Sequence, residues 1–314
     1  MATRRRAIGA ALLGLGGGLG GARRFALAQG ALPLVEAAPG VFVHHGLNED
    51  FTPENLGGIA NIGFVVGKEG VAVVDPGGSR LEGEMLLAAI RGRTKLPVTH
   101  VVLTHLHPDH VFGTAAFEGL PGVRFVGHEN LPNALQERGP AYLANMRTLL
   151  GDAAKGTEIV LPDTLVGDRM TIDLGGRVLG LRAWPTAHTN TDLTVQDEGG
   201  GLLFAGDLVS LERLPVVDGS LNGWLAVLPE LAAIPAKAVV PGHGPVTAPW
   251  PDALEPERAY LEALRDGLRR AIADGVPIEG AIKAVPMPVG GTWQLADETH
   301  PRNVMAGYTE LEWE

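Results

Sequence analysis

"THLHPDHVFG", residues 104–113, places three histidines and one aspartate within six positions, although the whole 314-residue chain has only ten histidines. Residues two apart in an extended segment point the same way, so His105 and His107 are expected to present both imidazoles to one point as a strand ends. Asp109 and His110 follow directly. Neutral imidazoles and carboxylates are ligand types that suit Zn²⁺ and similar metals. Four candidate ligands in six residues are too many for one tetrahedral ion, so the spacing predicts a loop that serves two adjacent metals.

Simpler interpretations of the same residues exist. Asp109 would also suit the N-cap of the helix that "HVFGTAAF" (110–117) predicts. Each histidine, taken alone, would suit the protein surface. The clustering nevertheless favours a metal site, because such a dense group of candidate ligands rarely arises by chance.

A pair of metals needs further ligands, and the second half of the chain offers three at predicted strand ends. "WPTAHTNTDL" is expected to end a strand at His188, "LLFAGDLV" at Asp207, and "AVVPGHGPV" at His243. Polar residues beside glycines at strand ends are places where sites tend to be built. Taken singly, Asp207 would suit a turn and His243 a loop between glycines. Taken with the first loop, the three residues complete a ligand set.

The rest of the chain alternates short apolar runs with amphipathic stretches. Strands or hairpins are expected at residues 40–46, 61–75, 98–104, 123–127, 169–184, 192–207 and 236–240. Helices are expected at residues 80–93, 130–151, 220–233 and 256–273, with two short ones around 286–291. Strands followed by a helix thus occur in two similar halves, which predicts an α/β fold of two packed sheets covered by helices.

Residues 1–28 have the pattern of a cleavable export signal. Arginines come first, then a Gly/Ala/Leu stretch, then an A-L-A sequence that ends at Ala28. "TRRRAI" is typical of a twin-arginine signal, which directs folded proteins across the bacterial inner membrane. A membrane anchor is the alternative, but the apolar run over 7–22 is too short and too rich in glycine to span a bilayer well. We therefore expect cleavage near Ala28, a periplasmic location and one mature domain over 29–314 with no stable membrane anchor.

Charge and cysteine content exclude several classes of function. Without residues 1–28, which contain five arginines and no acid, the chain has 20 basic and 36 acidic residues, a net charge of −16. Nucleic acid is a poor partner for such a surface. The chain has no cysteine, which rules out disulfides, a cysteine nucleophile and a thiolate metal ligand.

The ligand pattern resembles that of the metallo-β-lactamase superfamily. The resemblance covers most of residues 35–250 and implies a four-layer αββα sandwich, followed by a helical C-terminal tail from about residue 252. It also implies two ligand sets, a bridge and a supporting residue: His105, His107 and His188 for the first metal, Asp109, His110 and His243 for the second, Asp207 between them, and Asp75 in "VVDPGG" as support for the metal loop.

Two departures from subfamily patterns bear on the metal. Many true β-lactamases place a cysteine at the second-metal site, and this chain has none. Oxygen-reducing diiron relatives carry a glutamate at the position of His107. The second departure favours two Zn²⁺ ions over a redox diiron centre, with iron or manganese as alternatives.

The resemblance implies a dinuclear zinc hydrolase acting on a small molecule. A metal-bridging hydroxide would attack an ester-, lactone-, thioester- or amide-like group. Asp109 would orient that hydroxide or accept a proton. Asn190, two residues after His188, would donate to the bound substrate, or else it is an ordinary turn residue. The other five histidines receive no catalytic role. His300 is expected at a helix start or on the surface, with a pocket residue of the C-terminal tail as the alternative.

A narrower resemblance points to a partner. "NIGFVVGKEGVAVVDPGGS", "HPDHVFG", "RAWPTAHTNTDLTV", "PGHGP" and the closing "LEWE" resemble the exported group called quinoprotein relay system zinc metallohydrolases. That resemblance implies association with a periplasmic quinoprotein dehydrogenase system. Two alternatives stay open: a mononuclear iron dioxygenase that acts on sulfur compounds, and a non-catalytic quinoprotein assembly factor.

Overall fold

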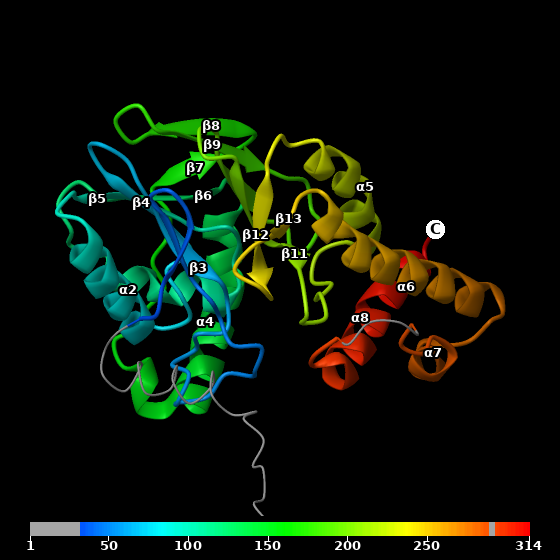
Figure 1. The fold of residues 1–314 in the computed structure, drawn as a ribbon. Coiled ribbons are helices and arrows are strands. Elements are labelled where there is room, and N and C mark those ends of the chain that lie inside the picture. The colour runs from blue at the N-terminus through cyan, green and yellow to red at the C-terminus, as the bar shows by residue number, and fades with distance from the viewer. Residues whose placement is uncertain (1–31, 289–292) are drawn as a thin grey trace, which may run out of the picture.

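A computed structural model describes residues 32–288 and 293–314 of the chain. Two β-sheets pack face to face, and helices cover the outer face of each sheet (Figure 1). This is the four-layer αββα sandwich that the sequence predicts, so the fold class is confirmed. The predicted export signal over residues 1–28 lies outside the described residues.

The first sheet has seven strands in the order of the sequence. They are β1 (Val35–Ala38), β2 (Val41–His44), β3 (Ile62–Val66), β4 (Val71–Val74), β5 (Val98–Val102), β6 (Arg124–His128) and β7 (Thr164–Val166). Strands β1 to β4 pair antiparallel, and β4 to β7 pair parallel. The carboxyl ends of the parallel strands share one edge, so the loops after β4 and β5 bring Asp75 and residues 104–113 together there.

The second sheet has six strands in the order β13-β12-β11-β10-β9-β8. They are β8 (Arg169–Asp173), β9 (Val178–Ala183), β10 (Leu193–Asp197), β11 (Leu202–Ser210), β12 (Ala238–His243) and β13 (Ala248–Pro249). Only β11 and β12 pair parallel, which brings Asp207 and His243 close together on adjacent strands. The sequence pattern missed β1, β7 and β13, because strands of two to four residues are too short to show a period.

The larger predicted helices of the first 273 residues are present near their expected ranges. They are α2 (Arg80–Arg93), α4 (Leu131–Leu150), α5 (Leu221–Ala232) and α6 (Glu255–Ala273). The first of them begins at Ser79, whose hydroxyl accepts from the backbone N–H of Glu82 at 3.2 Å and so caps the helix. No helix within the described residues is long and apolar enough to cross a membrane.

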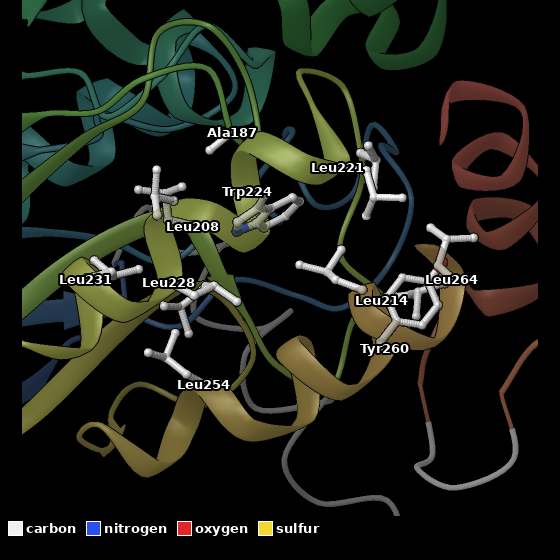
Figure 2. Packing of buried hydrophobic residues seen from close by; sticks show 14 of the residues in the cluster. Ala187, Leu208, Leu214, Leu221, Trp224, Leu228, Leu231, Leu254, Tyr260 and Leu264 are labelled. Carbon is white, nitrogen blue, oxygen red and sulfur yellow. The ribbon is translucent and has the colours of Figure 1, made fainter. Parts of the chain in front are cut away.

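Apolar side chains form three layers of core that correspond to the sandwich. One lies between the two sheets, one between the first sheet and α2 and α4, and one between the second sheet and the later helices. Figure 2 shows the last of these, where Leu208 of β11, Trp224 of α5 and Leu264 of α6 are among the buried side chains. Burial of this apolar surface is the main favourable contribution to folding.

The C-terminal tail differs from the prediction. Helix α7 (Ile278–Ala284) ends before the expected position, and α8 (Ala296–Leu311) is 16 residues long rather than short. Pro301 and Gly307 lie inside α8 and interrupt its sequence pattern. Tertiary packing supports the helix, since a Cβ at Gly307 would lie 2.7 Å from Cδ1 of Leu268 on α6. The structure thus has the two expected helices on either side of 286–291, but α8 is longer than predicted, because packing against α6 overrides local propensity.

His300 is a core residue, so its assignment to a helix start or the surface is wrong. The ring lies inside α8 and is 5% exposed. Its Nδ1 is 3.0 Å from the Tyr260 hydroxyl, and its Nε2 is 2.9 Å from the carbonyl of Val285. The histidine thereby joins α8 to α6 and to the residue after α7.

Candidate metal centre

All seven predicted ligands meet at one edge of the sandwich. They come from the loop after β5, from helix α3 (Pro108–Val111), from the loop between β9 and β10, from β11 and from the end of β12. One group, the first cluster, consists of His105, His107, His188 and Asp207, and the other, the second cluster, consists of Asp109, His110 and His243. Within each cluster, one candidate ligand atom from every residue lies within 4.8 Å of the others.

Ring nitrogens face one another in the first cluster. The Nδ1 atom of His107 is 3.1 Å from Nε2 of His105 and 3.0 Å from Nε2 of His188. The Oδ2 atom of Asp207 lies 3.5 Å from Nε2 of His188 and 3.8 Å from Nε2 of His105. Three nitrogens and one carboxylate oxygen therefore point at a common centre, which is the number of ligands that Zn²⁺ usually takes.

The second cluster shares the same aspartate. Asp207 lies 3.2 Å from Nε2 of His110 through Oδ1 and 3.3 Å from Nε2 of His243 through Oδ2. Asp109 Oδ2 is 3.3 Å from the His243 nitrogen and 3.6 Å from that of His110. Because Asp207 reaches the ligand atoms of both clusters, its position fits a bridge between two metals.

The outer ring nitrogens show which tautomers the histidines adopt. Nδ1 of His188 is 2.8 Å from the carbonyl of Val216, and Nδ1 of His243 is 2.9 Å from the carbonyl of Ile59. A carbonyl oxygen only accepts, so each Nδ1 must carry the proton and donate it. The inner Nε2 of each neutral ring is then a lone pair directed at the centre.

Side-chain oxygens lie beside the outer nitrogens of the other three rings and orient these rings as well. Asp75 Oδ2 lies 2.8 Å from Nδ1 of His110. The Thr104 hydroxyl donates to Asp75 at 2.8 Å and so offers a lone pair to Nδ1 of His105, 3.0 Å away. His107 is turned the other way: its Nε2 lies 2.8 Å from Asp218, which leaves Nδ1 facing the centre. Acceptors of this kind are what metal-ligating histidines use to hold their orientation.

The donor set fits a pair of divalent cations. Inner nitrogens that all carry lone pairs cannot hydrogen-bond one another, although two pairs of them approach to 3.0 and 3.1 Å. His110 Nε2 and Asp207 Oδ1 are buried and have no hydrogen-bond partner. Buried polar atoms without partners are costly, and cations between them would satisfy these atoms. The chemistry of the site, nitrogen and carboxylate oxygen without sulfur, suits zinc.

Burial keeps most of the first cluster in the form that binds metal. Desolvation lowers the pKa of His188 to about 4 and lowers the pKa of His105 well below its usual value. Both rings are therefore neutral at physiological pH. In the second cluster, burial alone would lower the pKa of His110, but the carboxylates of Asp207 and Asp109 raise it well above its usual value. The same two carboxylates would stabilise a bound metal cation in place of the proton.

Strand β11 does not end at Asp207, as the sequence pattern suggested, but continues to Ser210. The pairing with β12 is irregular on both sides of Gly206, which has φ +53°. Such an irregularity re-aims the next side chain within a strand. A Cβ at Gly206 would lie 2.7 Å from the Thr104 hydroxyl, and one at Gly242 would collide with Asp207. The glycines thus let the two sheets and the aspartate approach closely, which the sequence suggested only as a turn.

Two other local predictions need correction. Helix α3 begins at Pro108 with His107 as its N-cap, so Asp109 lies inside the first turn rather than at the cap. A 3₁₀ turn, η1 (Phe112–Ala116), follows in place of the expected continuous helix. His188 lies five residues beyond the end of β9 rather than at the strand end, and Ala187 and Thr189 beside it are hydrogen-bonded to each other.

Asn190 lies at an exposed position in the same loop. Its backbone carbonyl accepts from Nδ2 of Asn130 at 3.0 Å. The loop around it is held by Asp192, which accepts from the backbone N–H and the hydroxyl of Thr189. The structure therefore has Asn190 in the same loop as His188, but in neither cluster.

The accessible side of the centre is at His107. Its side chain is 15% exposed, whereas that of His110 is fully buried. Asp218, beside it, also binds Arg138 Nη2 at 2.7 Å. Tyr142 of α4 lies with its ring 6.2 Å from that of His107 and 5.0 Å from the Arg138 guanidinium. The most exposed ligand of the centre is therefore surrounded by an arginine, a tyrosine and an aspartate.

Several supporting residues had no signal in the sequence. Asp218 is one, because a single acid in a loop 111 positions from His107 shows no pattern. Glu82 and Glu257 are others: they accept from the backbone N–H groups of Gly78 and Ser210, each at 2.7 Å. Burial raises the pKa of Glu82 to about 8 and that of Glu257 well above its usual value, so both are protonated near neutral pH. They brace the backbone without adding charge.

Comparison with known proteins agrees with this fold. The family model described as the metallo-beta-lactamase superfamily matches residues 56–243. A search of curated proteins gave no significant match. The solved structure of a metallo-beta-lactamase from Pontibacter korlensis is similar with a TM-score of 0.60 and 24% identity, over 74% of this chain and 99% of that one.

Two further structures resemble the chain in the same way. The structure of TMB-1 aligns with a TM-score of 0.58 and 20% identity, over 74% of this chain and 97% of that one. A metallo-beta-lactamase from Hirschia baltica aligns with a TM-score of 0.57 and 17% identity, over the same shares. At these identities, the three likenesses establish the fold, whereas the chemistry depends on the ligand atoms described above.

Proposed function

Since this chain belongs to the metallo-beta-lactamase superfamily, we propose that it is a hydrolase that works with two bound zinc ions. Members of that superfamily are generally metal-dependent hydrolases, although some differ. One observation carries the proposal: five histidines have their outer nitrogens beside oxygens, and the inner nitrogens of four of them lie within 3.8 Å of one shared aspartate. The inner nitrogen of the fifth, His107, lies 3.0 and 3.1 Å from two of those four. The second cluster supports two metals over the single iron of the dioxygenase alternative.

The residues of the chain prepare the site for attack on a carbonyl-like group. Bound zinc would supply Lewis acidity, lowering the pKa of a water and polarising the substrate. Asp207 holds the two clusters at a fixed separation, and the buried neutral rings exclude bulk water. Asp109 Oδ2 lies between His110 and His243, where it serves as a ligand or accepts a proton during turnover. Asn190, in the exposed turn after His188, would donate to the substrate.

The substrate class is an ester-, lactone-, thioester- or amide-like small molecule. A panel of ester, lactone, thioester, phosphoester and β-lactam compounds, offered to the zinc-loaded mature protein, tests this. We expect hydrolysis of at least one compound, loss of the rate on chelation and recovery on adding zinc. A purified protein that retains no transition metal would contradict the proposal. Tight binding of one iron with thiol-dependent oxygen uptake would favour the dioxygenase instead.

We further propose that the protein is exported and acts in the periplasm. The support is the arginine, apolar and A-L-A order of residues 1–28. Fractionation of a bacterial host and N-terminal sequencing of the mature chain test it, with Gln29 as the expected first residue. A chain that keeps residues 1–28 in the cytoplasm would contradict export.

The proposed partner is a periplasmic quinoprotein dehydrogenase system, on the strength of the sequence resemblance alone. Deleting the gene should lower quinoprotein activity, and the intact gene should restore it. If the role is enzymatic, Asp207→Ala should fail to restore it. If Asp207→Ala restores it fully, the protein is a non-catalytic assembly factor.

A further inference from the structure

Residues 211–220, here called the orienting loop, connect β11 to α5 and hold two of the three histidines of the first cluster. The Val216 carbonyl accepts from Nδ1 of His188 at 2.8 Å, and Asp218 Oδ2 accepts from Nε2 of His107 at 2.8 Å. The backbone N–H of Asp218 also donates to the His188 carbonyl at 3.2 Å. The position of this loop therefore decides where the inner nitrogens of both rings point.

The C-terminal segment bonds to the orienting loop at several points. Gln294 N–H donates to the Glu212 carbonyl at 2.6 Å, and Leu214 N–H donates to the Gln294 carbonyl at 3.1 Å. At the far end of the loop, the carboxylate of Glu310 on α8 accepts from the Ser220 hydroxyl at 2.8 Å. Figure 2 shows Leu214 beside Tyr260, which belongs to the same buried cluster.

Asn303 of α8 bonds to the part of the orienting loop that holds His188. The residue is fully buried. Its Oδ1 accepts from the Val217 N–H at 2.9 Å, and its Nδ2 donates to the Pro215 carbonyl at 2.7 Å. These two bonds bracket Val216 and fix the peptide whose carbonyl accepts from His188.

A buried polar network stands behind Asn303. Its Nδ2 also donates to the Tyr260 hydroxyl at 2.9 Å, and that hydroxyl lies 3.0 Å from Nδ1 of His300. Buried polar groups are costly to leave partly bonded, whereas a complete network fixes one arrangement. All three side chains lie after residue 243, beyond the part of the chain that the family model matches.

We propose that Asn303 is a positioning residue for the first metal cluster, and that α6 to α8 set this cluster through the orienting loop. Asn303 touches no ligand and no substrate. It acts by holding Val216, which holds His188. The inference rests on the proposed zinc-dependent activity, but its readouts are zinc affinity and hydrogen exchange, so the two can fail separately.

The first test substitutes Asn303→Leu, which keeps the size and removes both bonds to the loop. The matched control is Tyr308→Phe, which removes one buried hydrogen bond from the same helix, to the carbonyl of Val276, without touching the orienting loop. Zinc affinity is measured by chelator competition in a His243→Ala background, where titration reports the first cluster. We expect about tenfold weaker binding with Asn303→Leu and no change with Tyr308→Phe.

A second readout follows His188 itself. In the zinc-loaded protein, its ring Nδ1–H should give a slowly exchanging NMR signal, because the Val216 carbonyl accepts it. Asn303→Leu should shift this signal or speed its exchange, whereas Tyr308→Phe should leave it unchanged. A folded Asn303→Leu protein with unchanged zinc affinity and an unchanged signal would overturn the proposal. An equal loss of affinity in Tyr308→Phe would do so too, because the effect would then be general destabilisation.

A third measurement needs no substitution and stands even if Asn303→Leu does not fold. Coupling between two sites is reciprocal, so bound zinc should in turn stabilise the segment of the orienting loop that Asn303 holds. We expect zinc to slow hydrogen exchange at the Val217 amide of the unmodified protein, with edge strand β8 unchanged. Protection confined to residues 104–113 would contradict the proposal. If these effects appear but no substrate is hydrolysed, the proposed activity fails and the positioning role remains.

Discussion

The two clusters use the same ligand types but are held by different parts of the chain. In the second cluster, His110 is held by Asp75 after β4, and His243 by the carbonyl of Ile59, just before β3. In the first, His107 and His188 are held by residues 211–220, which the C-terminal helices support.

Exposure singles out one residue, His107, rather than one cluster, because the other histidines of both clusters have side chains that are at most 5% exposed. The His110 side chain is fully buried, whereas His107 is 15% exposed and its partner Asp218 is 26% exposed. A site held by central strands is fixed when the sandwich folds, and a site held by a loop depends on what packs behind that loop. We infer that the second cluster is the more rigid one, and that the first cluster depends on the packing behind residues 211–220.

The largest expected effect comes from the residue that the clusters share. Asp207 lies between 3.2 and 3.8 Å from the ring nitrogens of four histidines. Asp207→Ala should prevent both clusters from retaining zinc and lower the hydrolytic rate by about 10³-fold, equivalent to about 4 kcal/mol. Elemental analysis and initial rates measure these effects. Loss of metal from one cluster only would show that the aspartate is not shared.

Asp197→Asn is the control for removing a buried carboxylate. Asp197 is fully buried in the same sheet and binds Arg177 at 3.1 Å through Nε. Its loss should cost about 3 kcal/mol of unfolding free energy, measured by urea denaturation, because it breaks a buried ion pair. Zinc content should stay unchanged.

The second prediction compares the two clusters by a substitution at Asp75. The residue has a φ of +55°, which an asparagine also tolerates. Asp75→Asn places an amide where Nδ1–H of His110 needs an acceptor. We expect zinc affinity at the second cluster to fall about 10–100-fold, measured by chelator competition. Affinity at the first cluster should fall less, because Asp75 acts there only through Thr104. Thr104→Val, which removes the acceptor of His105 instead, should weaken the first cluster. The reverse pattern would mean that the two sites are not held separately.

Much of this centre was predictable from the sequence, for physical reasons that also explain the failures. Residues 104–110 stand out because four ligands are adjacent, and His243 because it ends an apolar strand beside glycine. Asp207 was identified as a ligand, yet its strand end was placed wrongly, since an irregular β11 looks like a turn in sequence. Asn303 gave no signal at all.

The missed features share one property: their partners are remote or have no characteristic side chain. His188 is held by a backbone carbonyl, which any residue at position 216 would supply. The Asn303 contacts span 86 and 88 positions. The two sheets, by contrast, were predicted because periodicity is local to each strand and helix. Helix α8 was predicted too short, because its stability comes from packing against other helices and not from a periodic pattern in its own sequence.

The third prediction tests how Asp218 of the orienting loop supports the first cluster. Asp218→Asn keeps the shape but removes the charge that accepts from Nε2 of His107. We expect zinc affinity at the first cluster to fall about tenfold and the second to stay unchanged, measured by the same competition. Glu212→Gln is the control, since Glu212 lies in the same loop and accepts from Asn48 rather than from a metal-cluster histidine. Equal losses at both clusters would show that the orienting loop serves the whole site.

The smallest expected effect is a pH dependence that belongs to the first cluster alone. Burial would raise the pKa of Asp218, but the hydrogen bond from His107 and the charge of Arg138 lower it to about 2. A carboxyl whose folded pKa is depressed adds stability above its unfolded pKa, near 4, and loses it as the pH falls toward 2. In the metal-free protein, the difference in unfolding free energy between the unmodified chain and Asp218→Asn should therefore shrink by about 1 kcal/mol between pH 5 and pH 2, measured by urea denaturation. Asp163→Asn removes a carboxylate paired with Arg124 on the surface, where solvent screens the charges, and should show a smaller change. A pH-independent difference for Asp218→Asn would mean that the ion pair does not stabilise the loop, and that the first cluster is held by the Val216 carbonyl and Asn303 instead.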